Sequence, residues 1–205
     1  MFEDRTEAAR QLAARLMHCR SQSPLVLGIP RGGAPMARII ADALGSPCDV
    51  VLVRKLGAPG NPEFAVGAVE ESGWWFATAE AAAAGADEDY LAGERERQMQ
   101  IIRARRAAYT LQRPRLDPAD RTVIVVDDGL ATGSTMLAAL HAVRAQGAAH
   151  VVCAVPVAPT DTLAEVARHA DETICLEAAD SFGSVGAFYR RFDQVADEEV
   201  LRALA

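Results

Sequence analysis

An α/β fold, with a Rossmann-like parallel β-sheet flanked by helices, is predicted by two features of this 205-residue chain. Short β-branched apolar runs alternate with segments of helical periodicity, which is typical of parallel strands joined by crossover helices. One run, Val123–Val126, leads directly into two carboxylates and a glycine-rich turn, as at the end of a strand buried on both faces. Because 50% of the residues are hydrophobic, we expect one domain over residues 1–205, with a small hood or insertion.

The individual elements are assigned from the spacing of apolar residues. An opening helix is predicted around Leu12 and Leu16, after which strands and helices alternate. The predicted strands are Leu25–Pro30, Val50–Arg54, Ala65–Val69, Val123–Val126, Val151–Val157 and Thr173–Leu176. The predicted helices are Pro35–Leu44, Tyr90–Arg115, Ser134–Val143 and Asp161–Arg168. Ligands in such sheets bind at the carboxyl ends of strands, where the crossover connections diverge.

Residues 123–136, VIVVDDGLATGSTM, carry the most specific signal in the chain. Two glycines permit a tight turn, and three hydroxyl side chains stand beside the free N–H groups of a helix start. These residues are Gly129, Gly133, Thr132, Ser134 and Thr135. Such a corner attracts an anion, phosphate above all. The lysine of a P-loop is missing, which argues against a nucleoside triphosphatase of that class.

The carboxylates of Asp127 and Asp128 limit which phosphorylated ligands fit this turn. Next to a bare phosphate they would repel the ligand, but they can accept hydrogen bonds from the hydroxyls of a ribose 5-phosphate. A divalent cation can offset the remaining negative charge. The alternative is an ordinary strand-to-helix turn in which Asp128 is a cap.

The string VIVVDDGLATGST resembles the phosphoribosyl-diphosphate (PRPP) binding motif of type I phosphoribosyltransferases, except that Gly129 replaces a residue that is usually aliphatic there. The resemblance implies that Asp127 and Asp128 hold the ribose hydroxyls, with Mg²⁺ as the cofactor and these two acids as its indirect ligands. It also implies PRPP binding by the loop, with Gly129 within it and the 5-phosphate on Ala131, Thr132, Gly133, Ser134 and Thr135.

Two further segments fit the same ligand. The corner Arg31-Gly32-Gly33 offers backbone N–H groups and a guanidinium, which is either common turn chemistry or a diphosphate loop. The resemblance favours the diphosphate loop, with an unusual cis peptide around Arg31-Gly32, and makes Lys55 a catalytic contact of the diphosphate, together with Asp127 and Asp128. Arg54 is expected to pair with an acid or to face solvent.

Three segments are expected to lie outside the main sheet. Residues 56–64 are predicted to form a flexible loop over the ligand, or a plain hairpin connection before the next strand. Residues 87–113 are predicted to form a helical insertion, in which Arg95 and Arg106 either lie along a packed face or point into an anionic site. Residues 180–192 resemble a hood that stacks a base on Phe182, Phe188 or Tyr189, or else close the domain by packing.

Composition limits the partners and the compartment. The net charge of −7 gives no basic field for nucleic acid or anionic membranes, so small molecules are the expected partners. No signal peptide or membrane span is expected, and a cytoplasmic location is predicted. The four cysteines show no CxxC spacing, so we expect free thiols and no structural zinc, and the four histidines receive no role. A homodimer through Trp74 and Trp75 is a further expectation.

These features together predict a Mg²⁺-dependent phosphoribosyltransferase that moves the ribose 5-phosphate of PRPP to a nitrogenous base with release of diphosphate. The acceptor base is not specified by any motif. Two alternatives remain at this point: a regulatory protein that binds PRPP or a nucleotide without turnover, and a hydrolase of a phosphoribosyl compound.

Overall fold

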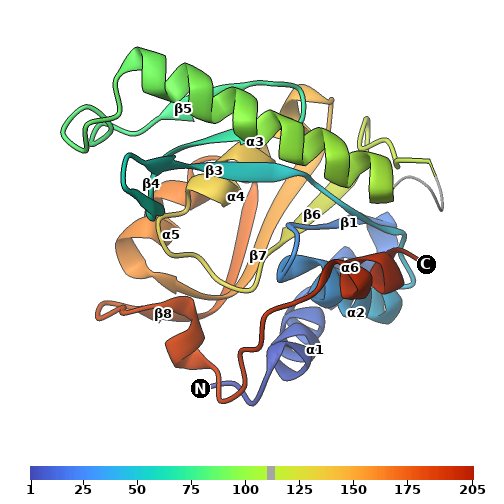
Figure 1. Ribbon diagram of the computed structural model, residues 1–205. Helices are drawn as coiled ribbons and strands as arrows, with labels where there is room; N and C mark the ends of the chain where they lie inside the picture. Colours follow the sequence, from blue (N-terminus) through green and yellow to red (C-terminus); the bar gives the residue numbers. More distant parts are fainter. Residues whose placement is uncertain (110–113) are drawn as a thin grey trace.

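A parallel sheet forms the centre of the computed structural model, which describes residues 1–109 and 114–205 (Figure 1). Within these residues the sheet has five strands in the order β2-β1-β6-β7-β8, and every neighbouring pair is parallel. The strands are β1 (Leu25–Gly28), β2 (Cys48–Val50), β6 (Thr122–Val126), β7 (His150–Pro159) and β8 (Glu172–Ala179). The predicted α/β fold is confirmed.

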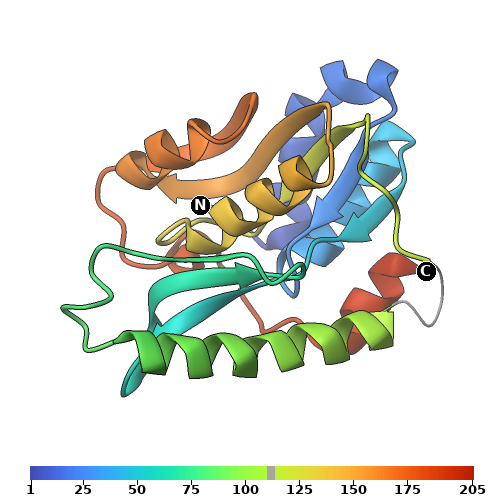
Figure 2. The ribbon, with the colours of Figure 1, turned by 90° about the horizontal axis from the view of Figure 1, so that it is seen from above.

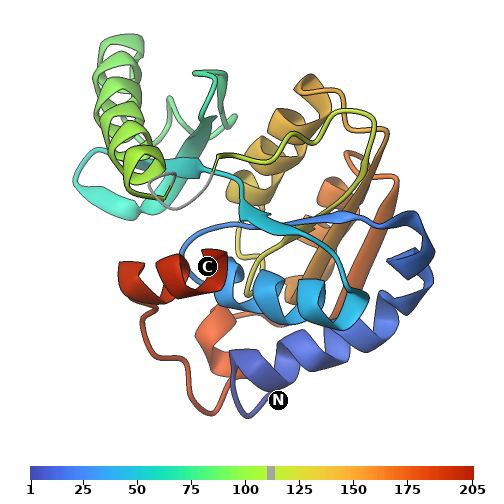
Figure 3. The same ribbon diagram turned by 90° about the vertical axis from the view of Figure 1, so that its right-hand side faces the viewer.

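Helices cover both faces of this sheet (Figure 3). On one face lie α1 (Arg5–Arg15) and α2 (Gly33–Leu44), and on the other lie α4 (Ser134–Ala145) and α5 (Thr160–Ala167). Strand β6 shows the consequence, because Val123 and Val125 pack in the core beside α4 whereas Ile124 and Val126 pack in the core beside α1 and α2. A strand buried on both faces reads as a continuous apolar run, as predicted. The C-terminal helix α6 (Asp197–Leu204), which packs on α2, was not predicted.

A second layer stands beside the sheet (Figures 2 and 3). It consists of an antiparallel sheet in the order β3-β4-β5, backed by a long helix. Its elements are β3 (Val53–Ala58), β4 (Asn61–Glu70), β5 (Trp75–Ala77) and α3 (Glu88–Tyr109). The β4 strand includes the predicted Ala65–Val69 strand.

The structure corrects three boundaries in this region. The predicted strand Val50–Arg54 is two strands, because the chain leaves the parallel sheet after Val50 and joins the antiparallel one at Val53. Residues 56–64 are the tip of a β3–β4 hairpin, turning at Gly60 with φ of +71°, as in the hairpin alternative. Helix α3 ends at Tyr109 among the described residues; the predicted positions 110–113 lie outside them, and Pro114 and Arg115 are not helical.

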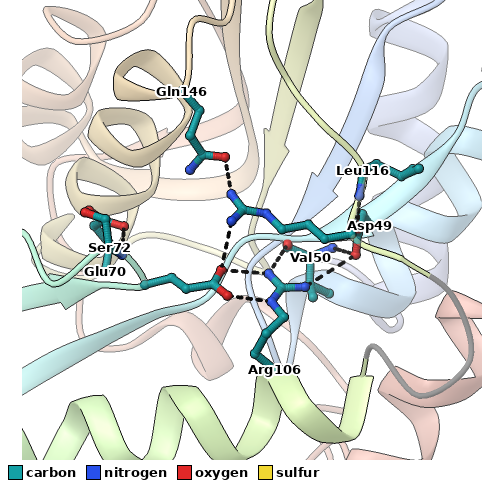
Figure 4. Close-up of polar contacts among 9 residues, drawn as sticks. Asp49, Val50, Glu70, Ser72, Arg106, Leu116 and Gln146 are labelled. Atoms are coloured by element: carbon teal, nitrogen blue, oxygen red, sulfur yellow. Dashed lines mark hydrogen bonds and ion pairs between the residues drawn. The ribbon is translucent and has the colours of Figure 1, made fainter.

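Two arginines of α3, Arg95 and Arg106, hold this layer together and do not face an anionic site. Arg95 lies over the ring of Trp75, with its guanidinium carbon 5.5 Å from the ring centre. Arg106 donates from Nε and Nη2 to both oxygens of Glu71, at 2.7 and 2.9 Å, and from Nη2 to the carbonyl of Val50 (Figure 4). Its Nη1 lies 3.9 Å from buried Asp49, which also accepts from the N–H of Leu116. The network therefore joins α3 to the end of β2 and to the β4–β5 turn.

No helix within the described residues is both long and apolar enough to cross a membrane.

Replacing Arg106 should destabilise the fold. Arg106→Ala leaves the partly buried carboxylate of Glu71 and the buried carboxylate of Asp49 without their main cation, so we expect the free energy of unfolding to fall by about 3 kcal/mol. Arg103→Ala is the matched control, since Arg103 lies on the same helix, is 65% exposed and, among the described residues, pairs at the surface with Glu96. Its effect should stay within about 0.5 kcal/mol. Urea unfolding followed by circular dichroism measures both, and equal effects would contradict the structural role.

Candidate ligand site at the carboxyl ends of β1 and β6

A cavity of about 200 Å³ opens where β6 ends. Its wall combines the turn after β6, the β3–β4 hairpin and one residue of the C-terminal segment. The lining residues are Lys55, Glu63, Ala65, Asp127, Gly129, Leu130, Ala131, Thr132, Gly133, Thr135, Met136 and Val185. Seven predicted site residues therefore meet in one place, whereas Arg31, Gly32, Gly33, Asp128 and Ser134 do not line it.

The turn after β6 presents unused backbone donors to this cavity. Gly133 has φ of +74° and leads into α4, so that the amides of the turn and of the first helical residues remain free of helical bonding. In the described part of the chain, no acceptor is found for the N–H groups of Ala131, Thr132, Gly133 and Thr135. Ser134 is buried, and its hydroxyl lies 3.1 Å from that of Thr132. Free amides converging at a helix start form an anion-binding corner.

Asp127 supplies a carboxylate beside these donors. Burial raises the pKa of Asp127 well above its usual range, and the neighbouring Asp128 raises it further. One oxygen accepts from the N–H of Asp128 at 2.9 Å, and no cation is paired with the group within the described residues. A carboxylate in this position gains from a ligand that donates hydrogen bonds or carries positive charge.

Asp128 points away from the cavity, toward the N-terminal helix. Its Oδ2 accepts from Nε of Arg5 at 2.8 Å, and both side chains are 16% exposed. The Arg5 guanidinium is itself fixed, because it stacks 3.8 Å above the ring of Phe192 and donates to the carbonyl of Asp193. Burial raises the pKa of Asp128, while Arg5 opposes that rise. The structure therefore separates two acids that the sequence treats as a pair, and the role of Asp128 in holding a ribose stays a prediction.

The turn after β1 packs closely against the turn after β6. A Cβ at Gly32 would lie 1.9 Å from Oδ2 of Asp128, and one at Gly33 would lie 2.3 Å from the carbonyl oxygen of Val126. Only glycine fits at these two positions. The peptide before this turn, Pro30–Arg31, is cis, one bond earlier than the expected position around Arg31-Gly32.

Three guanidiniums gather beyond this turn, and one of them, that of Arg105, lies 4.0 Å from Oδ1 of Asp197. Burial lowers the pKa of Arg54, and the positive charges of Arg105 and Arg31 lower it further, which places the three guanidiniums near one another. Arg54 donates to the side chain of Gln98 at 2.8 Å, so it neither pairs with an acid nor lies free in solvent as predicted. The side chain of Arg31 makes no hydrogen bond or ion pair with any other described residue. These like charges repel one another, so a polyanion that binds among them relieves the repulsion.

Lys55 reaches the cavity from the hairpin. Its Nζ lies 2.7 Å from Oε2 of Glu63, and this hydrogen bond lowers the pKa of Glu63. Arg54 and Lys55 project to opposite sides of β3, as the alternation of a strand requires. Glu63 was not identified from the sequence, although its position at the hairpin tip follows from the turn at Gly60.

The C-terminal segment contributes less to the cavity than predicted. Among residues 180–192, only Val185 lines it, from a short 3₁₀ turn (Val185–Phe188). Phe182 and Phe188 stack on each other, and Tyr189 is buried with its hydroxyl donating to the carbonyl of Asp128. Tyr189 is therefore a packing residue, as in the alternative that this segment closes the domain.

Val185 also explains the unusual residue at position 129. A Cβ at Gly129 would lie 2.6 Å from a methyl carbon of Val185 and 2.9 Å from one of Val157. The space that an aliphatic side chain would need is filled from the C-terminal segment. No local sequence signal identifies Val185 or Arg5, because both act on the turn from distant parts of the chain.

A parallel sheet with an anion-binding turn at its carboxyl edge defines an α/β protein of the kind that binds phosphorylated ligands. The model of the phosphoribosyl transferase domain matches residues 3–192, so the chain belongs to this family. The type I resemblance seen in the sequence is thereby confirmed at the level of the family.

Individual relatives agree with this assignment. A Mycobacterium tuberculosis H37Rv protein, provisionally described as a phosphoribosyl transferase, is 42% identical over 206 residues, covering 100% of this chain and 46% of the relative. A protein of the CDC 1551 strain with the same description matches to the same extent. The chain thus spans about half the length of the curated relatives it matches. Among solved structures, TT1426 of Thermus thermophilus is similar at a TM-score of 0.83 and 44% identity, covering 100% of this chain and 97% of that one.

Because burial disfavours the charged form of Asp127, replacing this side chain with a neutral one is predicted to stabilise the fold. Because its folded pKa is raised, the folded state holds the proton more tightly, and stability falls as pH rises above the usual range of a carboxyl. We expect Asp127→Asn to raise the free energy of unfolding at pH 7 by about 0.5–2 kcal/mol, with the difference vanishing in acid. Denaturant unfolding across pH measures it. The control is Glu80→Gln, at an exposed position without a side-chain partner among the described residues, and a destabilised Asp127→Asn would contradict the prediction.

Proposed function

We propose that this protein is a phosphoribosyltransferase that binds PRPP in the β6 cavity and transfers its ribose 5-phosphate to a nitrogenous base with release of diphosphate. The observation that carries the proposal is the joint presence, in one cavity, of the unused amides of Ala131, Thr132, Gly133 and Thr135 and of the Asp127 carboxylate, which no cation among the described residues pairs with. The amides suit the 5-phosphate, and the carboxylate suits the ribose hydroxyls. Family membership supports the same ligand.

The diphosphate is assigned to the basic side of the cavity. Lys55 lies in its wall, and the turn at Arg31-Gly32-Gly33 is in contact with the β6 turn through Gly32 and Asp128. In the proposed reaction a base nitrogen bonds to C1 of the ribose as the C1–oxygen bond to diphosphate breaks, and the electron pair leaves with the diphosphate. Lys55 and Arg31 would stabilise that developing charge, while the 5-phosphate corner fixes the reacting carbon.

Mg²⁺ fits the donors that face this cavity. Asp127 and Glu63 offer carboxylate oxygens, the ligand type that Mg²⁺ prefers, and it commonly binds through one or two carboxylates together with substrate phosphates. Asp128 is less suited because Arg5 already occupies one of its oxygens. When bound, the ion would neutralise charge on the diphosphate.

The assay is the release of diphosphate from PRPP in the presence of Mg²⁺ and a panel of purines, pyrimidines and pyridine acids. We expect release that depends on one class of base. Asp127→Asn should lower kcat/KM about 10²–10³-fold, because it removes the only carboxylate of the β6 turn that faces the cavity. Glu80→Gln should keep wild-type activity, since Glu80 lies outside the cavity.

Calorimetric titration with PRPP separates the proposal from its alternatives. Saturable PRPP binding without turnover on any base would identify a regulatory binding protein instead. Diphosphate release that ignores the base would identify a hydrolase. Absence of PRPP binding, with Asp127→Asn indistinguishable from wild type, would overturn the site itself.

A further inference from the structure

We infer that His18, Cys19 and Glu172 form a binding site for a zinc-type divalent cation at the amino ends of the strands, on the opposite edge of the sheet from the PRPP cavity. His18 and Cys19 lie in a 3₁₀ turn (Met17–Gln22) after α1, and Glu172 is the first residue of β8. One ligand atom from each of the three lies within 4.8 Å of the others. The sequence expectation of no zinc site rested on the missing CxxC pattern, and a carboxylate from a distant strand escapes that search.

The geometry converges on one nitrogen of the imidazole. Nε2 of His18 lies 2.9 and 3.1 Å from the two oxygens of Glu172 and 3.3 Å from Sγ of Cys19. Tetrahedral zinc with ordinary bond lengths separates such atoms by about 3.3–3.6 Å, so small side-chain rotations suffice to admit the ion. A proton relay would use the two ring nitrogens of His18 in series. Here the Glu172 carboxylate and the Cys19 sulfur both face Nε2.

The other ring nitrogen is already fixed for this role. Nδ1 of His18 lies 3.0 Å from the carbonyl oxygen of Arg15 and donates to it. With Nδ1 donating to the backbone, a proton on Nε2 makes the ion pair with Glu172 in the metal-free protein. A divalent cation would replace that proton and bind the Nε2 lone pair, and a backbone carbonyl on the distal nitrogen is the usual support of a metal-binding histidine.

The donors also match the ion in charge and softness. A thiolate and a carboxylate together carry two negative charges, equal to the charge of a divalent cation, and the mixture of sulfur, nitrogen and oxygen suits zinc better than Mg²⁺. The Cys19 thiol would give up its proton to solvent as the ion binds. Cys19 is 1% exposed, whereas His18 and Glu172 reach the surface, which gives the ion a path and an open fourth position.

The test is a titration of the full chain, freed of metal by a chelator, with Co²⁺ and then Zn²⁺. We expect one equivalent of Co²⁺ to produce a near-ultraviolet thiolate-to-cobalt band, and Zn²⁺ to displace it. Cys19→Ser should abolish the band, and Glu172→Gln, at a partly exposed position where misfolding is not expected, should weaken Co²⁺ binding at least tenfold.

Matched controls use the same residue types elsewhere. Cys175→Ser removes another thiol, and His169→Ala removes a surface histidine that pairs with Glu165 without a neighbouring cysteine. Both should leave the titration unchanged. Failure to develop the band in the wild-type chain, or a band that survives Cys19→Ser, would overturn the inference. Because neither PRPP nor a base enters the experiment, its outcome is independent of the proposed transferase activity.

Discussion

The contact between the turn after β1 and the turn after β6 is the constraint on which the site depends. These strands are neighbours in the middle of the sheet, and the helices that follow them, α2 and α4, pass to opposite faces. A crevice opens where such connections diverge. The turns come so close that Gly33 sits against the carbonyl of Val126 and Gly32 against Asp128. Side chains at either glycine would push apart the two turns that the proposed ligand would bridge.

That contact also decides how the two aspartates differ. Asp128 is held between Gly32 and Arg5, and Arg5 is in turn fixed by the C-terminal residues Phe192 and Asp193. The negative charge of Asp128 is therefore largely balanced by Arg5 within the protein. That of Asp127 faces the cavity and is not paired with a cation among the described residues. The N-terminal residue Arg5 and the C-terminal residues Phe192 and Asp193 thus position the turn after β6. Of the two terminal segments, only Val185 lines the cavity among the described residues.

The sequence predicted what is encoded in consecutive residues and missed what is assembled from distant ones. Residues 123–136 carry strand, acids and turn in one string, so their placement at the carboxyl end of β6 followed directly. The break between β2 and β3 was hidden because Val51 and Leu52 are buried in different cores and continue the apolar run. Arg5, Val185 and Glu172 lie far along the chain from their partners, and no local pattern marks them.

The hairpin that carries Lys55 suits a binding role because its ion pair is weak. The Lys55 side chain is 36% exposed and that of Glu63 is 87% exposed, so water screens their attraction and little free energy is lost when they separate. In the proposed complex a diphosphate would offer Lys55 a more highly charged partner in the same cavity. Glu63 would then be released from Lys55 and available to the Mg²⁺ proposed there. Lys55 can therefore exchange one partner for another without disturbing the buried pairing of the β3–β4 hairpin, whose apolar residues hold the wall in place.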